Sequence, residues 1–181
     1  MGNEAVKNDI VKGSLEITKQ DAEDASTKLP NVEFTLQSDK LVDGGPAYEE
    51  TKNTDVDGKV KFDGLWPGTY KLIETKAADG YQKHWKEIDI TINKQNEEHE
   101  ATITVENYEL VDIPVTKVWN DGGADARPDV TIKLNGASAN NDKFVEETYT
   151  LTKKDAVSGD NNAWSYTFEG LPAVDNQGAE I

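Results

Sequence analysis

Short runs of alternating apolar and polar residues recur along the whole chain. Side chains of a β-strand point alternately to its two faces, so such runs predict strands with one buried face. Turn-forming stretches rich in glycine, asparagine and aspartate separate the runs, as is typical of β-sandwiches and barrels. No stretch of useful length has a helical period, and residues 20–28 are expected to form a loop. The expected strands cover residues 15–19, 32–36, 59–65, 69–75, 87–92, 101–107, 113–119, 129–134, 147–152 and 164–171.

The runs fall into two groups, with a boundary near Tyr108–Asp112. One set of strands ends at VENYE, and a new set opens at IPVTKVW. Both groups begin alike, since LEITK and IPVTK each place a lysine after two apolar residues of the same face. We therefore expect two related domains, at residues 13–109 and 110–181, after a tag or linker at residues 1–12.

Three strands of the first group break the alternation in the same way. In each, two core positions are followed on the same face by one polar residue: Lys19 after Leu15 and Ile17, Glu74 after Tyr70 and Leu72, and Asn107 after Ile103 and Val105. A single exception is explained by a strand end that faces water. Three exceptions of complementary chemistry predict that a lysine, an acid and an amide meet at the edge of one apolar core.

Burial changes the chemistry of such groups. It lowers the pKa of an amine and raises the pKa of a carboxyl, so a neutral amine and a protonated acid become accessible. A protonated Glu74 is then expected to polarise the side-chain carbonyl of Asn107, and the amine of Lys19 to attack its carbon. Glu74 would then shuttle the protons, ammonia would leave, and a neutral amide would join Lys19 to Asn107, which removes a charged amine from the core.

Composition excludes several kinds of protein. The 181 residues contain no cysteine, which excludes disulfides, thiolate zinc sites and a cysteine nucleophile. The formal net charge of −16, from 35 acidic and 19 basic residues, argues against binding to nucleic acid or to anionic lipid. There is no apolar run long enough to span a membrane, and the first residues lack the apolar stretch of a signal peptide.

One motif resembles a metal site. Asn53, Asp55, Asp57 and Gly58 match the start of a calcium loop, but Gly64 stands where an EF-hand needs glutamate. We interpret Asp57–Gly58 as a tight turn between strands.

The histidines and tryptophans are also expected to have structural roles rather than to form a metal, cofactor or sugar site. His84 and His99 are isolated in polar surroundings, so neither a metal site nor a cofactor is expected. Tryptophans can form a platform for sugars, but in small β-domains they more often pack in the core or at its rim, which we expect for Trp66, Trp85, Trp119 and Trp164.

The stretch TDVDGKVKFDGLWPGTYKLIETKAADGY, residues 54–81, resembles the central signature of the SpaA/CnaB-type domains of Gram-positive pilins and surface adhesins. LEITKQD resembles the first strand of these domains and TVENYE the last, so the resemblance covers roughly residues 13–109, with Ala78 where the family usually has proline. It implies a reversed immunoglobulin-like sandwich with an internal Lys–Asn or Lys–Asp isopeptide bond, formed with the help of a glutamate. Position by position, it implicates Lys19, Asn107 and Glu74.

The second group of strands resembles the related Cna B-type repeat. The residues that carry this resemblance include VTKVW at 115–119, Arg127–Pro128, Trp164, Tyr166–Phe168 and Leu171–Pro172. Lys117 stands at the position of the reactive lysine, but the strands with its glutamate and asparagine partners would lie beyond Ile181. Glu169 is no substitute, because it alternates away from the core face. We therefore expect an incomplete second domain with an unpaired Lys117.

These observations predict an all-β chain of two immunoglobulin-like (reversed-Ig, CnaB-type) β-sandwich domains in tandem, the second C-terminally incomplete. The resemblance implies stalk or shaft domains of a Gram-positive pilin or adhesin, extracellular and attached to the cell wall or pilus. Other domains or subunits of the same surface protein or pilus are the expected partners, with host extracellular matrix as a further candidate.

No cofactor, no metal, no nucleic acid and no membrane insertion are expected, and no enzymatic turnover beyond a single self-cross-linking event. Two alternatives stay open: a module that binds a host protein or glycan, and an accessory domain of a secreted carbohydrate-active enzyme.

Overall fold

The computed structural model describes residues 10–39, 45–93, 100–123 and 126–181. The chain divides into two compact units, Met1–Asn107 and Tyr108–Ile181. Strands dominate both units, so the prediction of an all-β chain is confirmed. Most of the expected tag or linker, residues 1–9, and His99 lie outside the described residues. Over the described ranges, no helix is long and apolar enough to cross a membrane.

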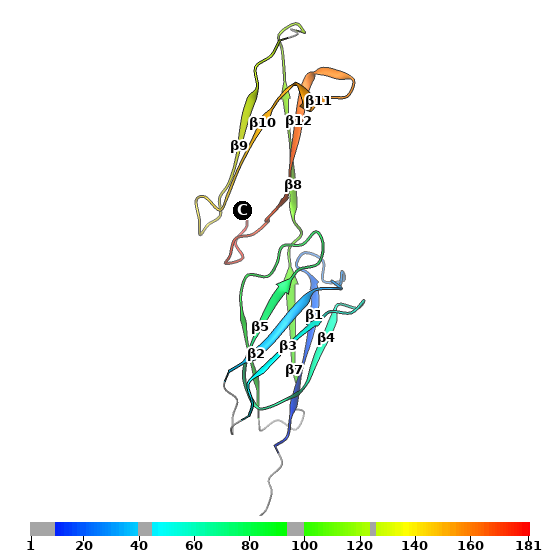
Figure 1. Ribbon diagram of the computed structural model, residues 1–181, viewed down its shortest axis with the longest axis vertical. Coiled ribbons are helices and arrows are strands. Elements are labelled where there is room, and N and C mark those ends of the chain that lie inside the picture. Colours follow the sequence, from blue (N-terminus) through cyan, green and yellow to red (C-terminus); the bar gives the residue numbers. More distant parts are fainter. Residues whose placement is uncertain (1–9, 40–44, 94–99, 124–125) are drawn as a thin grey trace, which may run out of the picture. The chain divides into compact units, whose positions relative to one another are not determined.

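The first unit consists of seven described strands in two sheets (Figure 1). The strands are β1 (Gly13–Asp21), β2 (Glu33–Ser38), β3 (Tyr48–Asn53), β4 (Lys59–Leu65), β5 (Gly68–Lys76), β6 (Ile88–Ile92) and β7 (Glu100–Asn107). One sheet has the order β4-β1-β7 and the other β3-β2-β5-β6. The inward faces of the two sheets share one core, which makes the unit a β-sandwich.

The core of the first unit is formed by alternate positions of its strands. Along β1, buried and half-buried residues alternate from Gly13 to Asp21. The largest fully buried apolar side chains come from both sheets: Leu15, Ile17, Phe62 and Leu65 from one, and Phe34, Leu36, Tyr70 and Leu72 from the other. Burying each such side chain stabilises the fold by roughly 1.5–3 kcal/mol. The period-2 pattern of the sequence therefore identifies the core.

Strand β3 was not predicted from the sequence. Its sequence, YEETKN, has a single apolar residue, and it pairs with β2 at the edge of its sheet. The hydroxyls of Thr35 and Thr51 are hydrogen-bonded across this pair at 2.8 Å, and the ring of Tyr48 packs edge-on against Tyr70. Backbone pairing and such cross-strand contacts hold an edge strand without a continuous apolar face, so hydropathy does not detect it.

Strand β1 lies between two partners of opposite direction. It pairs antiparallel with β4 and parallel with β7, beside which it lies in Figure 1. In the parallel pair, Lys19 is opposite Val105 and Asp21 is opposite Asn107. Parallel neighbours require a long connection, and here the rest of the sandwich forms it. The first and last strands of the unit are therefore adjacent and run in the same direction.

A tight turn at residues 55–59 fixes the backbone of β1 at Lys19. The Asp55 carboxylate accepts hydrogen bonds from the amides of Asp57 and Lys59, at 2.9 and 2.8 Å, and so stabilises the turn. The carbonyl of Gly58 accepts a hydrogen bond from the amide of Lys19 at 2.7 Å. Gly58 has φ of +68°, and a Cβ there would lie 2.4 Å from the carbonyl oxygen of Lys19. The turn therefore requires glycine at this position.

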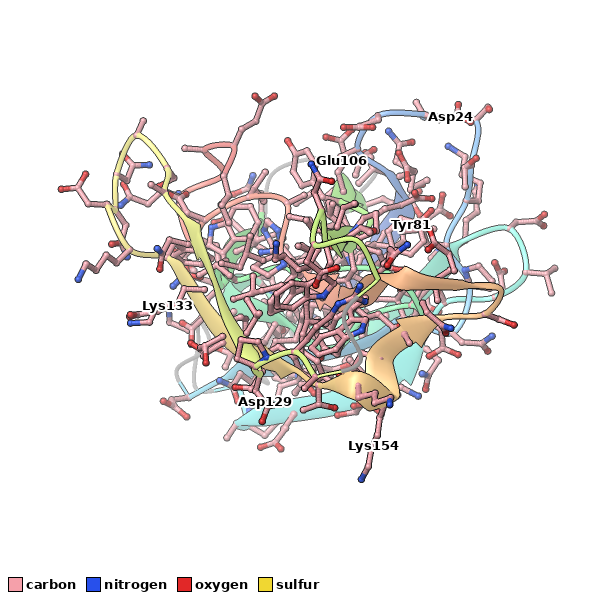
Figure 2. All side chains as sticks on the ribbon, turned by 90° about the horizontal axis from the view of Figure 1, so that it is seen from above. Asp24, Tyr81, Glu106, Asp129, Lys133 and Lys154 are labelled. Carbon is pink, nitrogen blue, oxygen red and sulfur yellow. The ribbon has the colours of Figure 1, made fainter. Side chains whose placement is uncertain are left out.

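The second unit also has two sheets (Figure 1). Its strands are β8 (Val111–Val118), β9 (Val130–Gly136), β10 (Val145–Leu151), β11 (Ala156–Val157) and β12 (Asp160–Leu171), with a short 3-10 turn, η2 (Lys153–Asp155). β9 pairs with β10, and β12 lies between β11 and β8. Its main core cluster contains three buried residues, Val145, Phe168 and Leu171, surrounded by half-buried side chains. Charged side chains such as Lys133 and Lys154 point away from the ribbon (Figure 2).

A buried carboxylate holds the end of the second unit. Asp175 is 2% exposed and accepts hydrogen bonds from the side chains of Ser138 and Asn140, at 2.6 and 2.9 Å. The amides of Gln177 and Ala179 also donate to it, at 2.8 and 3.0 Å. These donors, that of Ser138 first, hold the pKa of Asp175 well below its usual range. The carboxylate thereby joins the 138–140 loop to the last residues of the chain.

We expect Gly58→Ala to destabilise the first unit much more than Gly64→Ala. Gly64 has φ of +70° but open space around its missing Cβ, so its substitution costs only the left-handed backbone, roughly 1–2 kcal/mol. Gly58→Ala adds the clash with the Lys19 carbonyl, roughly 1–3 kcal/mol more. Urea unfolding of the two variants measures the difference, and equal midpoints would contradict the proposed role of Gly58.

Candidate cross-linking site

Lys19 is a fully buried lysine near the end of β1. Its side chain follows Leu15 and Ile17 on the core face, and its exposed fraction is 0%. Its amide donates to Gly58, and its carbonyl accepts a hydrogen bond from the amide of Leu29 at 3.1 Å. The backbone at this position is therefore held between two loops, and the side chain must extend into the core.

Asn107 is the last residue of β7 and points into the same core. Its position in the parallel register is two residues beyond that of Lys19, about 6.6 Å at about 3.3 Å per residue. A lysine side chain that leans along its strand covers such a distance. The length of the lysine and the register of β1 and β7 together bring the amine to the amide.

Glu74 reaches these two residues from the opposite sheet. It lies on β5 after Tyr70 and Leu72 and is 2% exposed. The site is therefore formed by the first strand, the last strand and a strand of the facing sheet. The structure brings together the three residues that the sequence predicts to meet.

The contacts among the three side chains are short. The Nζ atom of Lys19 lies 2.5 Å from Oδ1 of Asn107 and 3.3 Å from Oε2 of Glu74. The Nδ2 atom of Asn107 donates to Oε1 of Glu74 at 2.7 Å. Within a single amide group, bond lengths of 1.33 and 1.23 Å separate nitrogen and oxygen by about 2.3 Å. The amine is thus almost as close to the Asn107 oxygen as an amide nitrogen bonded to Cγ would be.

The orientation of Glu74 differs from the expectation. The sequence predicts a carboxyl that first polarises the carbonyl of Asn107 and then shuttles protons, but the carboxyl lies against the nitrogen of the amide. One carboxyl oxygen faces the amine of Lys19 and the other faces Nδ2. This geometry suits the expected proton shuttle, in which the carboxyl takes a proton from the amine and delivers one to the departing nitrogen, but not the expected polarisation of the carbonyl.

Burial lowers the pKa of Lys19 to about 8, although the charges of Glu74 and then Glu106 oppose this shift. A neutral amine, which is the nucleophilic form, therefore becomes accessible near neutral pH. An ion pair in an apolar core loses more solvation than a pair at the surface, and its attraction compensates only in part. A reaction that converts the amine into a neutral amide removes this cost.

Two residues that support the site were not identified from the sequence. His84 donates its main-chain N–H to Oε1 of Glu74 at 3.2 Å. Thr54 is 3% exposed, and its hydroxyl accepts a hydrogen bond from the amide of Val32 and donates one to the carbonyl of Leu29. The amide of Leu29 in turn donates to the carbonyl of Lys19. Both act through loops, where hydrophobic periodicity carries no signal. In the sequence, only its place at the start of the 54–81 motif, in the pair Thr54–Asp55, marks Thr54 as a residue of interest.

Lys117 lies in a different environment from Lys19. It is half-buried on β8, opposite Trp164 in the pairing with β12. Its Nζ donates to the carbonyl of Val118 at 2.9 Å and lies 4.5 Å from the centre of the Trp119 ring. Among the described residues, no carboxylate is ion-paired to it. Glu169 is exposed on β12.

The tryptophans of the second unit form part of a packed cluster. Trp164 is 3% exposed, and its ring packs edge-on against Trp119 at 5.2 Å. The Arg127 guanidinium lies 5.5 Å from the Trp119 ring centre and pairs with both oxygens of Asp121. Trp66 and Trp85 of the first unit are half-buried. The rings pack against each other and against the half-buried Arg127, in line with the interpretation of the tryptophans as core or rim residues.

Comparison with solved structures identifies the fold. The chain is similar to the Bacillus anthracis TIE protein, with 24% identity over 88% of this chain and 27% of that one, and a TM-score of 0.52. It is also similar to a streptococcal ancillary pilin, with 21% identity over 96% of this chain and 57% of that one, and a TM-score of 0.51. The chain spans about a quarter of the first of these proteins and just over half of the second. A comparison with curated proteins finds no match.

Family models match both units. Residues 113–181 match the Cna protein B-type domain, and residues 13–108 match the SpaA prealbumin-like fold domain. The prediction of two tandem domains of the SpaA and CnaB types is confirmed. Since the SpaA model covers more than half of the 181 residues, the chain belongs to the SpaA prealbumin-like fold domain family.

Proposed function

We propose that the first unit is a structural domain that carries tension in a Gram-positive surface protein or pilus, stabilised by an isopeptide bond between Lys19 and Asn107. The observation that carries the proposal is the buried contact of 2.5 Å between the Lys19 amine and the Asn107 side chain, with Glu74 beside both. Membership of the SpaA family supports it. So does the shared fold of a streptococcal ancillary pilin, from which we take the surface or pilus location and other subunits as partners.

The reaction needs no cofactor, because the three side chains supply every group that it uses. Glu74 takes one proton from the Lys19 ammonium through the oxygen that faces Nζ. The neutral amine attacks Cγ of Asn107 and forms the Nζ–Cγ bond. In the intermediate, Nζ and Nδ2 are bonded to the same carbon, so the protonated oxygen of Glu74 passes its proton to Nδ2 without rotation of the carboxyl. The Cγ–Nδ2 bond then breaks and ammonia leaves.

The second proton of the amine passes to Glu74, which is left neutral, and the ammonia departs as a neutral molecule. Atoms and charge balance, and the lysine becomes a neutral secondary amide. A buried positive charge disappears and the chain is cross-linked once, without turnover.

The position of the bond suits a domain under tension. β1 and β7 are parallel neighbours, so force that enters at Gly13 and leaves at Asn107 would shear one strand past the other. A bond from Lys19 to Asn107 would carry this force along β1 from Gly13 to Lys19 and then directly into the end of β7. The chain between the two bonded residues would stay unloaded.

The bond would also stabilise the domain against unfolding. It closes a loop between residues that are 88 positions apart, which stabilises the fold by roughly 4–5 kcal/mol in the chain-entropy model. This is comparable to the whole stability of many domains. The family matches and the buried site favour this role over a ligand-binding module or an enzyme accessory domain.

The first prediction concerns the mass of the protein. Folded protein should be lighter than its sequence mass by one ammonia, and a peptide map should join the peptides of Lys19 and Asn107. Lys19→Arg should abolish the loss, because guanidinium stays protonated. Lys117→Arg is the matched control and should retain it, since Lys117 contacts a carbonyl and a tryptophan ring instead. A full sequence mass in folded wild-type protein would disprove the bond.

The second prediction concerns Glu74. Glu74→Gln keeps the size of the side chain but removes proton transfer, so linking should slow by a factor of about 100 or more. The unlinked variant should recover the ammonia mass and melt roughly 15–30 °C lower. Glu106→Gln removes an exposed carboxylate that also acts on Lys19, and it should still link. If Glu74→Gln links at the wild-type rate, Glu74 serves packing alone.

The third prediction concerns extension under force. When the protein is pulled from the two ends of the first unit, wild type should not release the chain between Lys19 and Asn107. Asn107→Ala, which cannot link, should release a further length of roughly 300 Å, from a separation of 88 residues at about 3.5 Å each. Single-molecule force spectroscopy measures this difference. Equal extension of both proteins would contradict a tension-carrying bond.

A further inference from the structure

The segment between β5 and β6, residues 77–87, contacts the cross-linking site through His84. This residue is half-buried, whereas Lys19, Glu74 and Asn107 are at most 2% exposed. Its main-chain N–H donates to Oε1 of Glu74 at 3.2 Å. The donor belongs to a loop rather than to the sheets that position the three reacting side chains.

The two oxygens of Glu74 have different surroundings because of this contact. Oε1 accepts two N–H donors, from Asn107 and from His84, while Oε2 faces the amine of Lys19 at 3.3 Å. The last torsion of a glutamate is soft, so a carboxyl held by one donor can rotate and exchange its oxygens. A second donor on the same oxygen, fixed to the backbone, opposes that rotation.

We propose that His84 is a positioning residue for the cross-link, whose main-chain amide holds the Glu74 carboxyl with one oxygen toward Lys19 and the other toward the departing nitrogen of Asn107. This inference rests on the proposed function and adds the loop between β5 and β6 to the site. It separates two roles of residue 84. The main-chain amide orients Glu74, and the side chain is not needed for the reaction.

The imidazole of His84 is close enough to the site for the charges of Lys19 and Glu74 to change its pKa. Burial lowers the pKa of His84, the positive charge of Lys19 on β1 lowers it further, Glu74 on β5 raises it, and Lys86 of the same loop lowers it. Linking removes the charge of Lys19, whose effect on the pKa of His84 is larger than that of Glu74. The pKa of His84 is therefore higher in linked protein than in unlinked protein, and the imidazole reports formation of the bond.

Two variants of residue 84 separate the amide from the side chain. His84→Pro removes the N–H donor, whereas His84→Gln keeps it and removes the imidazole. Each protein is made by cell-free synthesis and quenched in denaturant at successive times, and intact mass spectrometry follows the loss of ammonia. We expect His84→Pro to link about tenfold or more slowly, as for a lost hydrogen bond to a charged group, and His84→Gln to stay within about twofold of wild type.

Linking of His84→Pro at the wild-type rate would overturn the inference, and so would equal slowing of both variants, since the side chain would then be responsible. Failure of wild type itself to lose ammonia would instead disprove the proposed function. The two failures are therefore distinguishable.

A second measurement covers the case in which proline disturbs the loop. NMR titration should give His84 a higher pKa in linked wild type than in Asn107→Ala, because the charge of Lys19 is gone only in the linked protein. Lys19→Met removes the charge without forming a bond, and its His84 should titrate near the wild-type value. The same His84 pKa in wild type and Asn107→Ala would show that His84 does not contact the site as described and would overturn the inference.

Discussion

A lysine amine enclosed in an apolar core is the constraint on which the first unit depends. Lys19 has no exposed surface, and its backbone is held on both sides by the turn at Gly58 and by the amide of Leu29. The side chain has no route to water, so its charge must be paired or removed. Glu74 provides the pairing, and the proposed bond to Asn107 would remove the charge. The same burial that disfavours the ion pair lowers the pKa of the amine and makes it a nucleophile, so the cost and the chemistry have one cause.

The fold supplies the geometry that this chemistry needs. The parallel register of β1 and β7 sets an offset that the length of a lysine matches, and the facing sheet contributes the acid. Each partner comes from a rigid strand, so the three groups lie within hydrogen-bond distance without an induced movement. The proposed bond would join the first strand of the unit to the last, where chain closure removes the most freedom from the unfolded state and where tension on the domain would enter and leave it. The position of the proposed bond would therefore increase both the stability of the domain and its resistance to force.

Much of this could be predicted from the sequence, and the limits have physical reasons. Side chains of a strand alternate with a period of two, so Lys19, Glu74 and Asn107 stand out in the amino-acid sequence as polar residues on apolar faces. The same rule fails for β3, because an edge strand such as YEETKN is held by backbone pairing more than by apolar burial. It also fails for Thr54 and His84, whose contributions depend on where loops return in space. The orientation of Glu74 toward the nitrogen of Asn107 depends on atomic contacts that no residue pattern encodes.

Comparison of the two lysines shows what makes such a site. Lys19 and Lys117 follow similar strand sequences, LEITK and IPVTK, on strands that begin their units. Lys19 is flanked by β4 and β7 and faces β5, whereas Lys117 is paired through β12 and rests on a tryptophan ring. The first lysine is enclosed beside an acid and an amide, and the second is half-buried beside a carbonyl. A lysine at the end of an apolar strand face is therefore a precondition, and its reactivity depends on the strands that enclose it. The motif predicts where a cross-link can form. Burial decides whether the lysine amine loses its charge readily enough to act as a nucleophile.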